Sequence, residues 1–395
     1  MGGSALAGLA VAVPVLCAAL SAWLAARALV RGTFTKSKAL DETWGGLRKV
    51  HVFVTPRTGG IAIAAGLLVG LGVECVLYGT SCPWWLLVFA GLPGFVWGLI
   101  EDFSNRGSVA VRLAFTALGA AIGFILVDAR ITQLHVPGLD NLLAIHAFSF
   151  AFTVFAVTGV AHSINIIDGL NGLSGVVAAC AAIGLAILAA IVGDAFVLSA
   201  ACVLAASIAG FLVLNYPRGR IFLGDGGAYL VGLLLAELSV ILVHRNSEVS
   251  PWFPLVLLAY PVWETLFSMY RRKNRGGSTG EADCLHFHTL VYRRVVRWHS
   301  FRGSPRDYVT RNSIASACLW IVPVLCLVIA LSFWQSSAAL QLAALGFGIA
   351  YTLAYRRLVR FGVPAWLVLR AKPRDAAAKE FLLHSRRSTR IGSGL

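Results

Sequence analysis

The sequence predicts an all-α polytopic membrane protein, built as a bundle of about eleven transmembrane helices. Of its 395 residues, 58% are hydrophobic and only 13% are charged, whereas soluble domains carry roughly 25% charged residues. Apolar runs long enough to cross a bilayer, which takes about 20 residues, recur along the whole chain. This composition excludes a soluble cytosolic enzyme and a disordered chain.

The apolar runs give the expected helices in order. The first run has no Lys or Arg before Arg27, and a signal peptide would begin with basic residues, so we expect a retained helix there. The remaining runs are separated by short polar or glycine-containing segments. We expect spans at about 5–26, 59–79, 83–100, 109–127, 142–162, 174–192, 195–214, 226–243, 251–270, 313–333 and 337–355.

The basic residues predict the orientation of the bundle. With the N-terminus outside and alternating spans, only Arg130 and Arg245 lie outside. The other 31 of the 33 Lys and Arg residues then lie inside, as the positive-inside rule requires. We therefore expect a periplasmic N-terminus and a cytoplasmic C-terminus. The inner regions are 27–58, 101–112, 215–224, 271–312 and 356–395.

This distribution also defines the expected organisation. Residues 1–355 form one transmembrane domain, in which 271–312 is a long cytoplasmic substrate loop, and 356–395 form a basic cytoplasmic tail. The net charge of +15 belongs to one face, so we expect anionic membrane lipids or a phosphorylated substrate as partners, and no nucleic acid.

Three polar residues recur at constant spacing in the segment 163–175. Asn165, Asp168 and Asn171 are each three residues apart among Ile and Leu, so a helical or 3₁₀ turn would place them on one face. A polar loop that caps the next helix is the alternative, but capping accounts for one such residue rather than three. We therefore expect a functional cluster here.

Further acids lie at the same predicted face. Asp225 stands among glycines in the segment 222–228, where a helix N-terminus would offer free N–H groups to an anion. Glu101 and Asp102 close the third span. The alternatives are an ordinary turn around Asp225 and simple helix capping by Glu101 and Asp102. Acids at a membrane boundary are costly unless paired, solvated or metal-bound, which favours function.

Basic side chains complete this face. His286 and His288 lie in the long loop, with Arg293 nearby, and Arg57 precedes the second span. No Cys or third His completes a zinc set, so phosphate binding is the better functional interpretation. The alternatives are a solvated basic loop and, for Arg57, a purely topological role.

Acids and bases on one face suggest a metal-assisted phosphate site. Carboxylate and amide oxygens suit Mg²⁺, which usually takes one or two carboxylates together with substrate phosphates. Mg²⁺ is therefore the expected cofactor, with Mn²⁺ as its substitute.

Five motifs in this order resemble the polyprenyl-phosphate N-acetylhexosamine-1-phosphate transferase family. The resemblance implies a helical bundle with a cytoplasmic, Mg²⁺-dependent active site. The motifs are TPRTGGIAI (55–63), GLIEDF (98–103), SINIIDGLNGLSG (163–175), FLGDGGA (222–228) and HFHT (286–289).

The resemblance also implies roles for single residues. It implies catalytic roles for Glu101, Asp102 and Asp168 and metal binding by Asn165 and Asp225. It further implies that Asn171 binds the uracil base and that His286 and His288 bind phosphate. Arg293 and Arg57 are the further residues that we expect to bind the substrates. Three positions depart from the family pattern: Glu101 replaces the usual Asp, His162 the first Asn of the NxxN motif, and Thr289 the last His.

The expected reaction transfers a HexNAc-1-phosphate from a UDP-N-acetylhexosamine to undecaprenyl phosphate, which releases UMP. It would start O-antigen, capsule or other envelope glycan synthesis at the bacterial inner membrane, and some relatives form homodimers. Two alternatives stay open: a secondary transporter, for which Glu237 and Glu264 are acids within expected spans, and a family member without activity. A transporter would usually show an internal repeat, and none is visible.

Overall fold

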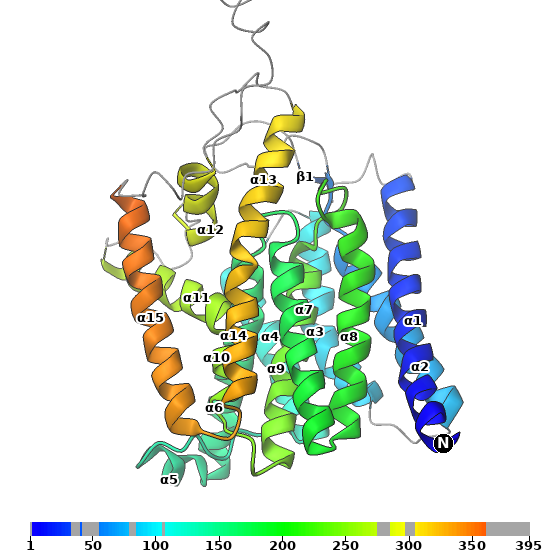
Figure 1. Cartoon of the computed structure of the whole chain (residues 1–395), viewed down its shortest axis with the longest axis vertical. Helices are drawn as coiled ribbons and strands as arrows, with labels where there is room; N and C mark the ends of the chain where they lie inside the picture. Colours follow the sequence, from blue (N-terminus) through cyan, green and yellow to red (C-terminus); the bar gives the residue numbers. More distant parts are fainter. Residues whose placement is uncertain are drawn as a thin grey trace, which may run out of the picture.

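The computed structural model describes residues 2–32, 40–41, 55–78, 84–104, 107–274, 285–296 and 305–360. Within these residues, ten helices are long and apolar enough to cross a membrane. The protein is thus a multi-pass, helical membrane protein (Figure 1). Parts of the expected substrate loop (275–284 and 297–304) and the tail from 361 to 395 lie outside the described residues.

The long helices follow the apolar runs of the sequence closely. Two of these helices, α13 and α14, follow each other almost directly and together form the span before the last one. In chain order they are α1 (Gly2–Arg31), α2 (Gly59–Tyr78), α3 (Trp84–Ser104), α4 (Val109–Leu126), α6 (His146–Ile166), α7 (Leu173–Val192), α8 (Ala195–Asn215), α9 (Gly224–Arg245), α13 (Pro305–Leu319), α14 (Ile321–Ser332) and α15 (Ser337–Val359).

Short elements connect these helices. They comprise an antiparallel pair of two-residue strands, four short or interrupted helices and one π-helix. They are β1 (Leu40–Asp41), β2 (Thr55–Pro56), α5 (Leu139–Leu143), α10 (Phe253–Leu257), α11 (Ala259–Asn274), α12 (Phe287–Leu290) and the π-helix η2 (Val291–Val295).

The expectation of one continuous helix over 251–270 is wrong. The chain forms α10 and then α11, with a break at Leu258, and neither helix is among the ten candidate spans. Pro261 explains the break, because it has no N–H for the carbonyl one turn earlier and its ring crowds that turn. Figure 1 shows α11 tilted strongly against the long helices around it.

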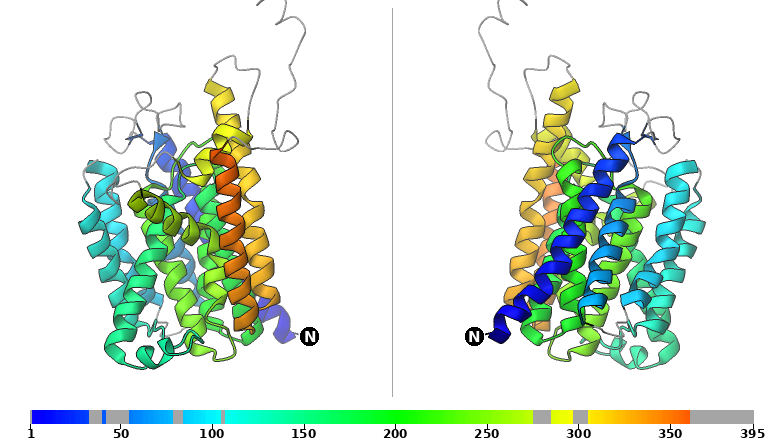
Figure 2. Two further views of the ribbon diagram at one scale, coloured as in Figure 1. Left: turned by 90° about the vertical axis from the view of Figure 1, so that its left-hand side faces the viewer. Right: turned by 90° about the vertical axis from the view of Figure 1, so that its right-hand side faces the viewer.

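The two ends of the bundle carry different elements. Figures 1 and 2 place the N-terminus and α5 at one end and β1, α12 and the last turn of α15 at the other. The start of α1 and the end of α15 therefore lie at opposite ends of the bundle. This arrangement agrees with the expected alternation, while the assignment of either end to the cytoplasm stays a prediction.

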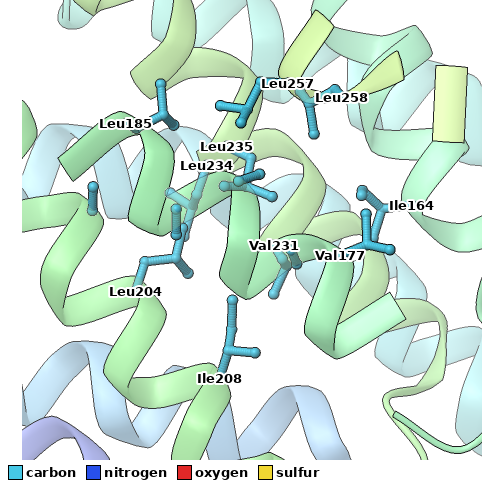
Figure 3. Packing of buried hydrophobic residues seen from close by; sticks show 14 of the residues in the cluster. Ile164, Val177, Leu185, Leu204, Ile208, Val231, Leu234, Leu235, Leu257 and Leu258 are labelled. Atoms are coloured by element: carbon cyan, nitrogen blue, oxygen red, sulfur yellow. The ribbon is translucent and has the colours of Figure 1, made fainter. Parts of the chain in front are cut away.

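Helix α9 forms the centre of the bundle. It is the most buried of the candidate spans and contacts α2, α3, α4, α6, α7 and α8. Figure 3 shows Val231, Leu234 and Leu235 of α9 packed between side chains of α6, α7, α8 and α10.

Glycines let α9 approach its neighbours at backbone distance. A Cβ placed on Gly98 of α3 would lie 2.4 Å from the Gly226 nitrogen. A Cβ on Gly60 of α2 would lie 2.4 Å from the Gly227 nitrogen. The glycines after Asp225 therefore let the backbones of α2 and α3 pack directly against the first turn of α9.

Gly98→Ala should lower the midpoint of thermal unfolding in detergent. The added methyl must displace the backbone of α9, and overpacking of this kind typically costs about 1–3 kcal/mol. Gly72→Ala in α2 is the matched control, because its added Cβ meets nothing within 4 Å. Equal midpoints for Gly98→Ala and Gly72→Ala would contradict the close approach of α3 and α9.

Candidate active site

The N-terminus of α9 is held by a carboxylate from α3. Asp102 accepts the backbone N–H of Asp225 at Oδ1 and that of Gly226 at Oδ2, both at 3.0 Å. These N–H groups have no partner within their own helix, and a negative charge is favoured at this end. Gly224 turns the chain into the helix with a φ of +76°, a conformation that favours glycine. Asp102 thereby fixes the position of Asp225.

Asp225, in the first turn of α9, contacts a residue near the end of α6. The amide Nδ2 of Asn165 donates to Asp225 Oδ1 at 2.7 Å. The two residues predicted to share a metal ion are therefore neighbours, although 60 residues separate them in the chain.

Asp168 lies in the loop between α6 and α7. Its Oδ1 accepts from the Ser174 hydroxyl at 2.5 Å. Loss of hydration raises the pKa of Asp168 to about 6, and the charge of Asp225 adds to this, while Ser174 and Arg57 oppose it. At neutral pH this carboxyl is mostly ionised and can still take up a proton.

Backbone hydrogen bonds bring Arg57 to the same place. The Phe222 N–H donates to the Pro56 carbonyl, and the Gly59 N–H donates to the Phe222 carbonyl, both at 2.9 Å. The Gly60 N–H continues the series to the Leu223 carbonyl at 2.9 Å. The first and fourth sequence motifs thus lie side by side.

Asn215, at the end of α8, joins two of the motif loops. Its Oδ1 accepts from the Gly172 N–H and its Nδ2 donates to the Ile221 carbonyl, both at 2.7 Å. Asn215 is not among the residues predicted from the sequence, where it is one amide at the end of an apolar run. Its position there is the only sequence feature that marks it.

These elements enclose one polar pocket of ≈ 250 Å³. It brings together five of the ten predicted site residues and adds Asn215 and the backbone of Gly169. The predicted residues that line it are Arg57, Asp102, Asn165, Asp168 and Asp225.

The donor set of this pocket fits a hard divalent cation. Among the described residues of its lining, three carboxylates face one guanidinium, so added positive charge would relieve their repulsion. No three His, Cys, Asp or Glu side chains in the described part of the chain form a metal cluster. A cation would therefore take Asp225, the Asn165 amide oxygen and substrate phosphate oxygens, a set typical of Mg²⁺.

The histidine motif reaches the edge of the pocket through His288. A Cβ on Gly169 would lie 2.3 Å from His288 Nε2, so the imidazole rests against the backbone of a residue that lines the pocket. Burial lowers the pKa of His288 to about 4, which leaves the ring neutral at pH 7. The His286 ring lies parallel to it, with centroids 5.4 Å apart.

Besides His288, four predicted site residues do not line the pocket. Glu101 is buried behind it and accepts from Arg112 Nε at 2.7 Å. Asn171 is 2% exposed, and its Nδ2 donates to the Pro217 carbonyl. Arg293 is exposed on η2. His286 is bound instead by Glu264 of α11, which the sequence analysis had noted only as an acid in an expected span.

The comparison with known families agrees with this geometry. The profile of glycosyl transferase family 4 matches residues 84–243, which run from α3 to the end of α9. Over these residues the chain is similar to the polyprenyl-phosphate N-acetylhexosamine-1-phosphate transferases. The match includes Asp102, Asn165, Asp168 and Asp225, while Arg57 and the histidine motif lie outside it.

Relatives in this transferase family come from several bacteria. A probable undecaprenyl-phosphate N-acetylglucosaminyl 1-phosphate transferase of Bacillus subtilis is 27% identical over 61% of this chain and 66% of its own length. A decaprenyl-phosphate N-acetylglucosaminephosphotransferase of Mycobacterium leprae is 28% identical over 63% and 71%. An undecaprenyl-phosphate alpha-N-acetylglucosaminyl 1-phosphate transferase of Thermotoga maritima is 27% identical over 64% and 72%. The similarity thus spans about two thirds of these relatives.

Asn171→Ala should lower protein stability by about 1 kcal/mol, the usual net worth of one hydrogen bond. The amide tethers the Pro217 carbonyl and lies outside the pocket, so the affinity for a uridine nucleotide should stay unchanged. Thermal unfolding and calorimetric titration with UMP measure the two effects. Unchanged stability with weakened UMP binding would instead support the base contact that the sequence analysis expects.

Proposed function

We propose that this protein transfers a HexNAc-1-phosphate from a UDP-sugar to a polyprenyl phosphate and releases UMP. One observation carries the proposal: Asn165 and Asp225 lie within one hydrogen bond of each other in a pocket that also holds Arg57 and Asp168. The pocket lies at one end of an apolar helical bundle, where a lipid headgroup could meet a soluble nucleotide sugar. The similarity to these transferases supports the same reaction.

Charge dominates the chemistry of this reaction. The oxygen of one phosphate must approach the phosphorus of another, so the site has to neutralise negative charge on both substrates. Asn165 and Asp225 would hold Mg²⁺, or Mn²⁺ in its place. When bound, the ion would neutralise the diphosphate and stabilise the leaving UMP.

The remaining pocket residues have distinct tasks in this proposal. Arg57 would bind a phosphate directly, because a guanidinium suits paired phosphate oxygens. Asp168 would position the acceptor, since its carboxylate lines the same pocket as Asn165 and Asp225. Both oxygens of Asp102 already bind the N-terminus of α9, so its role is to position Asp225.

The names of the relatives suggest the acceptor lipid, and the distribution of basic residues suggests the face of the membrane at which the reaction takes place. Undecaprenyl phosphate is the acceptor we propose, since the names of several relatives contain this lipid. We place the reaction at the cytoplasmic face of the bacterial inner membrane, where 31 of the 33 basic residues are expected. The product would start O-antigen, capsule or another envelope glycan. The sugar is a UDP-N-acetylhexosamine whose identity the assay below determines.

The direct test uses the purified full-length protein with undecaprenyl phosphate, MgCl₂ and a panel of UDP-N-acetylhexosamines. We expect UMP release together with a lipid product heavier by one HexNAc-phosphate, as read by mass spectrometry. Chelation with EDTA should abolish both, and added Mn²⁺ should restore them. UMP release that persists in excess EDTA would contradict the metal site. A silent wild-type protein with every donor would favour the inactive family member, and substrate flux without UMP would favour the transporter.

Asp225→Asn should reduce UMP release to background while the protein still inserts and unfolds at a normal temperature. The substitution keeps the size of the side chain and removes the charge that would hold the cation. Glu248→Gln, at an exposed acid after the other end of α9, is the control and should leave turnover unchanged. Near-normal turnover of Asp225→Asn would overturn the metal assignment.

A further inference from the structure

A buried glutamate outside the pocket organises the histidine motif. Glu264 of α11 is 0% exposed. Its Oε1 accepts from His286 Nδ1 at 2.9 Å, and the Phe287 N–H lies 3.2 Å from each carboxylate oxygen. The Tyr351 hydroxyl of α15 donates to Oε2 at 2.8 Å. One carboxylate thus receives donors from α15 and from the start of α12.

The buried carboxylate of Glu264 and the histidine motif stabilise each other. Glu264 holds the motif in place, and the motif supplies the hydrogen-bond donors that a buried carboxylate needs. A buried carboxylate is very costly unless donors satisfy it. Two of its three donor groups described above come from His286 and Phe287. If the motif moved away, Glu264 would retain Tyr351 and the more distant Ser268 hydroxyl at 3.5 Å.

The contact also requires a hydrogen on one nitrogen of the His286 ring. An ionised carboxylate only accepts hydrogen bonds, so His286 Nδ1 must carry the hydrogen. This leaves Nε2 as the ring nitrogen on the side away from Glu264. The parallel His288 ring, 5.4 Å away, rests against Gly169 at the pocket edge. The glutamate therefore determines the rotation of the His286 ring and keeps a hydrogen on its Nδ1.

We propose that Glu264 is the positioning residue of the histidine motif: it holds His286 so that an Nε2–H can donate to a phosphate of the nucleotide sugar, and it keeps His288 seated at the pocket. This inference rests on the proposed function, in which the motif binds phosphate. Glu264 does not touch the substrate and acts only through His286 and the backbone of Phe287. Carboxylates that orient metal-binding histidines act in the same manner.

A double-mutant cycle tests whether Glu264 acts through His286. Glu264→Gln should lower kcat/KM for the UDP-sugar by roughly 10- to 100-fold, as for other carboxylates that orient a functional histidine. In a His286→Ala background the same substitution should have almost no further effect, because the residue through which it acts is gone. Losses that multiply in the double variant would overturn the proposal. Tyr351→Phe is the matched control, since it removes one donor to Glu264 and leaves both contacts with the motif.

Hydrogen exchange gives a readout that does not need activity. Glu264→Gln should speed amide exchange in segment 285–291, where the Phe287 N–H loses its ionised acceptor, and Tyr351→Phe should change it much less. Unchanged exchange in Glu264→Gln would overturn the proposal. An active wild type whose kcat/KM survives Glu264→Gln would also overturn it and leave the proposed function intact. A wild type silent with every donor would instead overturn the proposed function, and the exchange data would still test the docking.

A second variant covers the case in which Glu264→Gln does not fold. His286→Asn keeps an N–H donor near the position of Nδ1 and removes Nε2. It should preserve the slow exchange of segment 285–291 but lose kcat/KM as strongly as His286→Ala. Full activity of His286→Asn would show that Nε2 has no task and would overturn the proposal.

Discussion

The two hydrogen bonds from the N-terminus of α9 to Asp102 are the constraint on which the site depends. They join α3 to α9 at 3.0 Å, and they work only because Gly98 and Gly226 let the two backbones meet. Asp225 is then held beside Asn165 at the end of α6. A predicted catalytic acid thus becomes the residue that shapes the pocket, because both of its oxygens are already bound.

Much of the fold could be predicted from local sequence, since in a membrane the length of an apolar run nearly determines the helix. The run at 174–192 became α7, Leu173–Val192, almost without change. The prediction of one helix over 251–270 was wrong for a local reason as well. Pro261 breaks the helix at Leu258 although the run is apolar. Apolar length alone does not include that effect.

The pocket could be predicted in part. Asn165, Asp168 and Asp225 were found because polar residues recur within apolar sequence, and such residues converge when both loops lie at the same end of the bundle. Glu101 and Asn171 carry the same sequence pattern, but Arg112 and the Pro217 carbonyl bind them outside the pocket. Partners such as Asn215 for Gly172 and Glu264 for His286 are set by tertiary packing across 43 and 22 residues, which spacing does not encode.

Mn²⁺ binding followed by electron paramagnetic resonance tests the central claim most directly. The spectrum of free Mn²⁺ is recorded while purified protein is added in the presence of UMP. The account predicts saturable binding of one ion per chain, which is lost when Asn165→Ala and Asp225→Ala are combined. A free-ion spectrum that wild-type protein does not change, or binding that survives in the double variant, would contradict it.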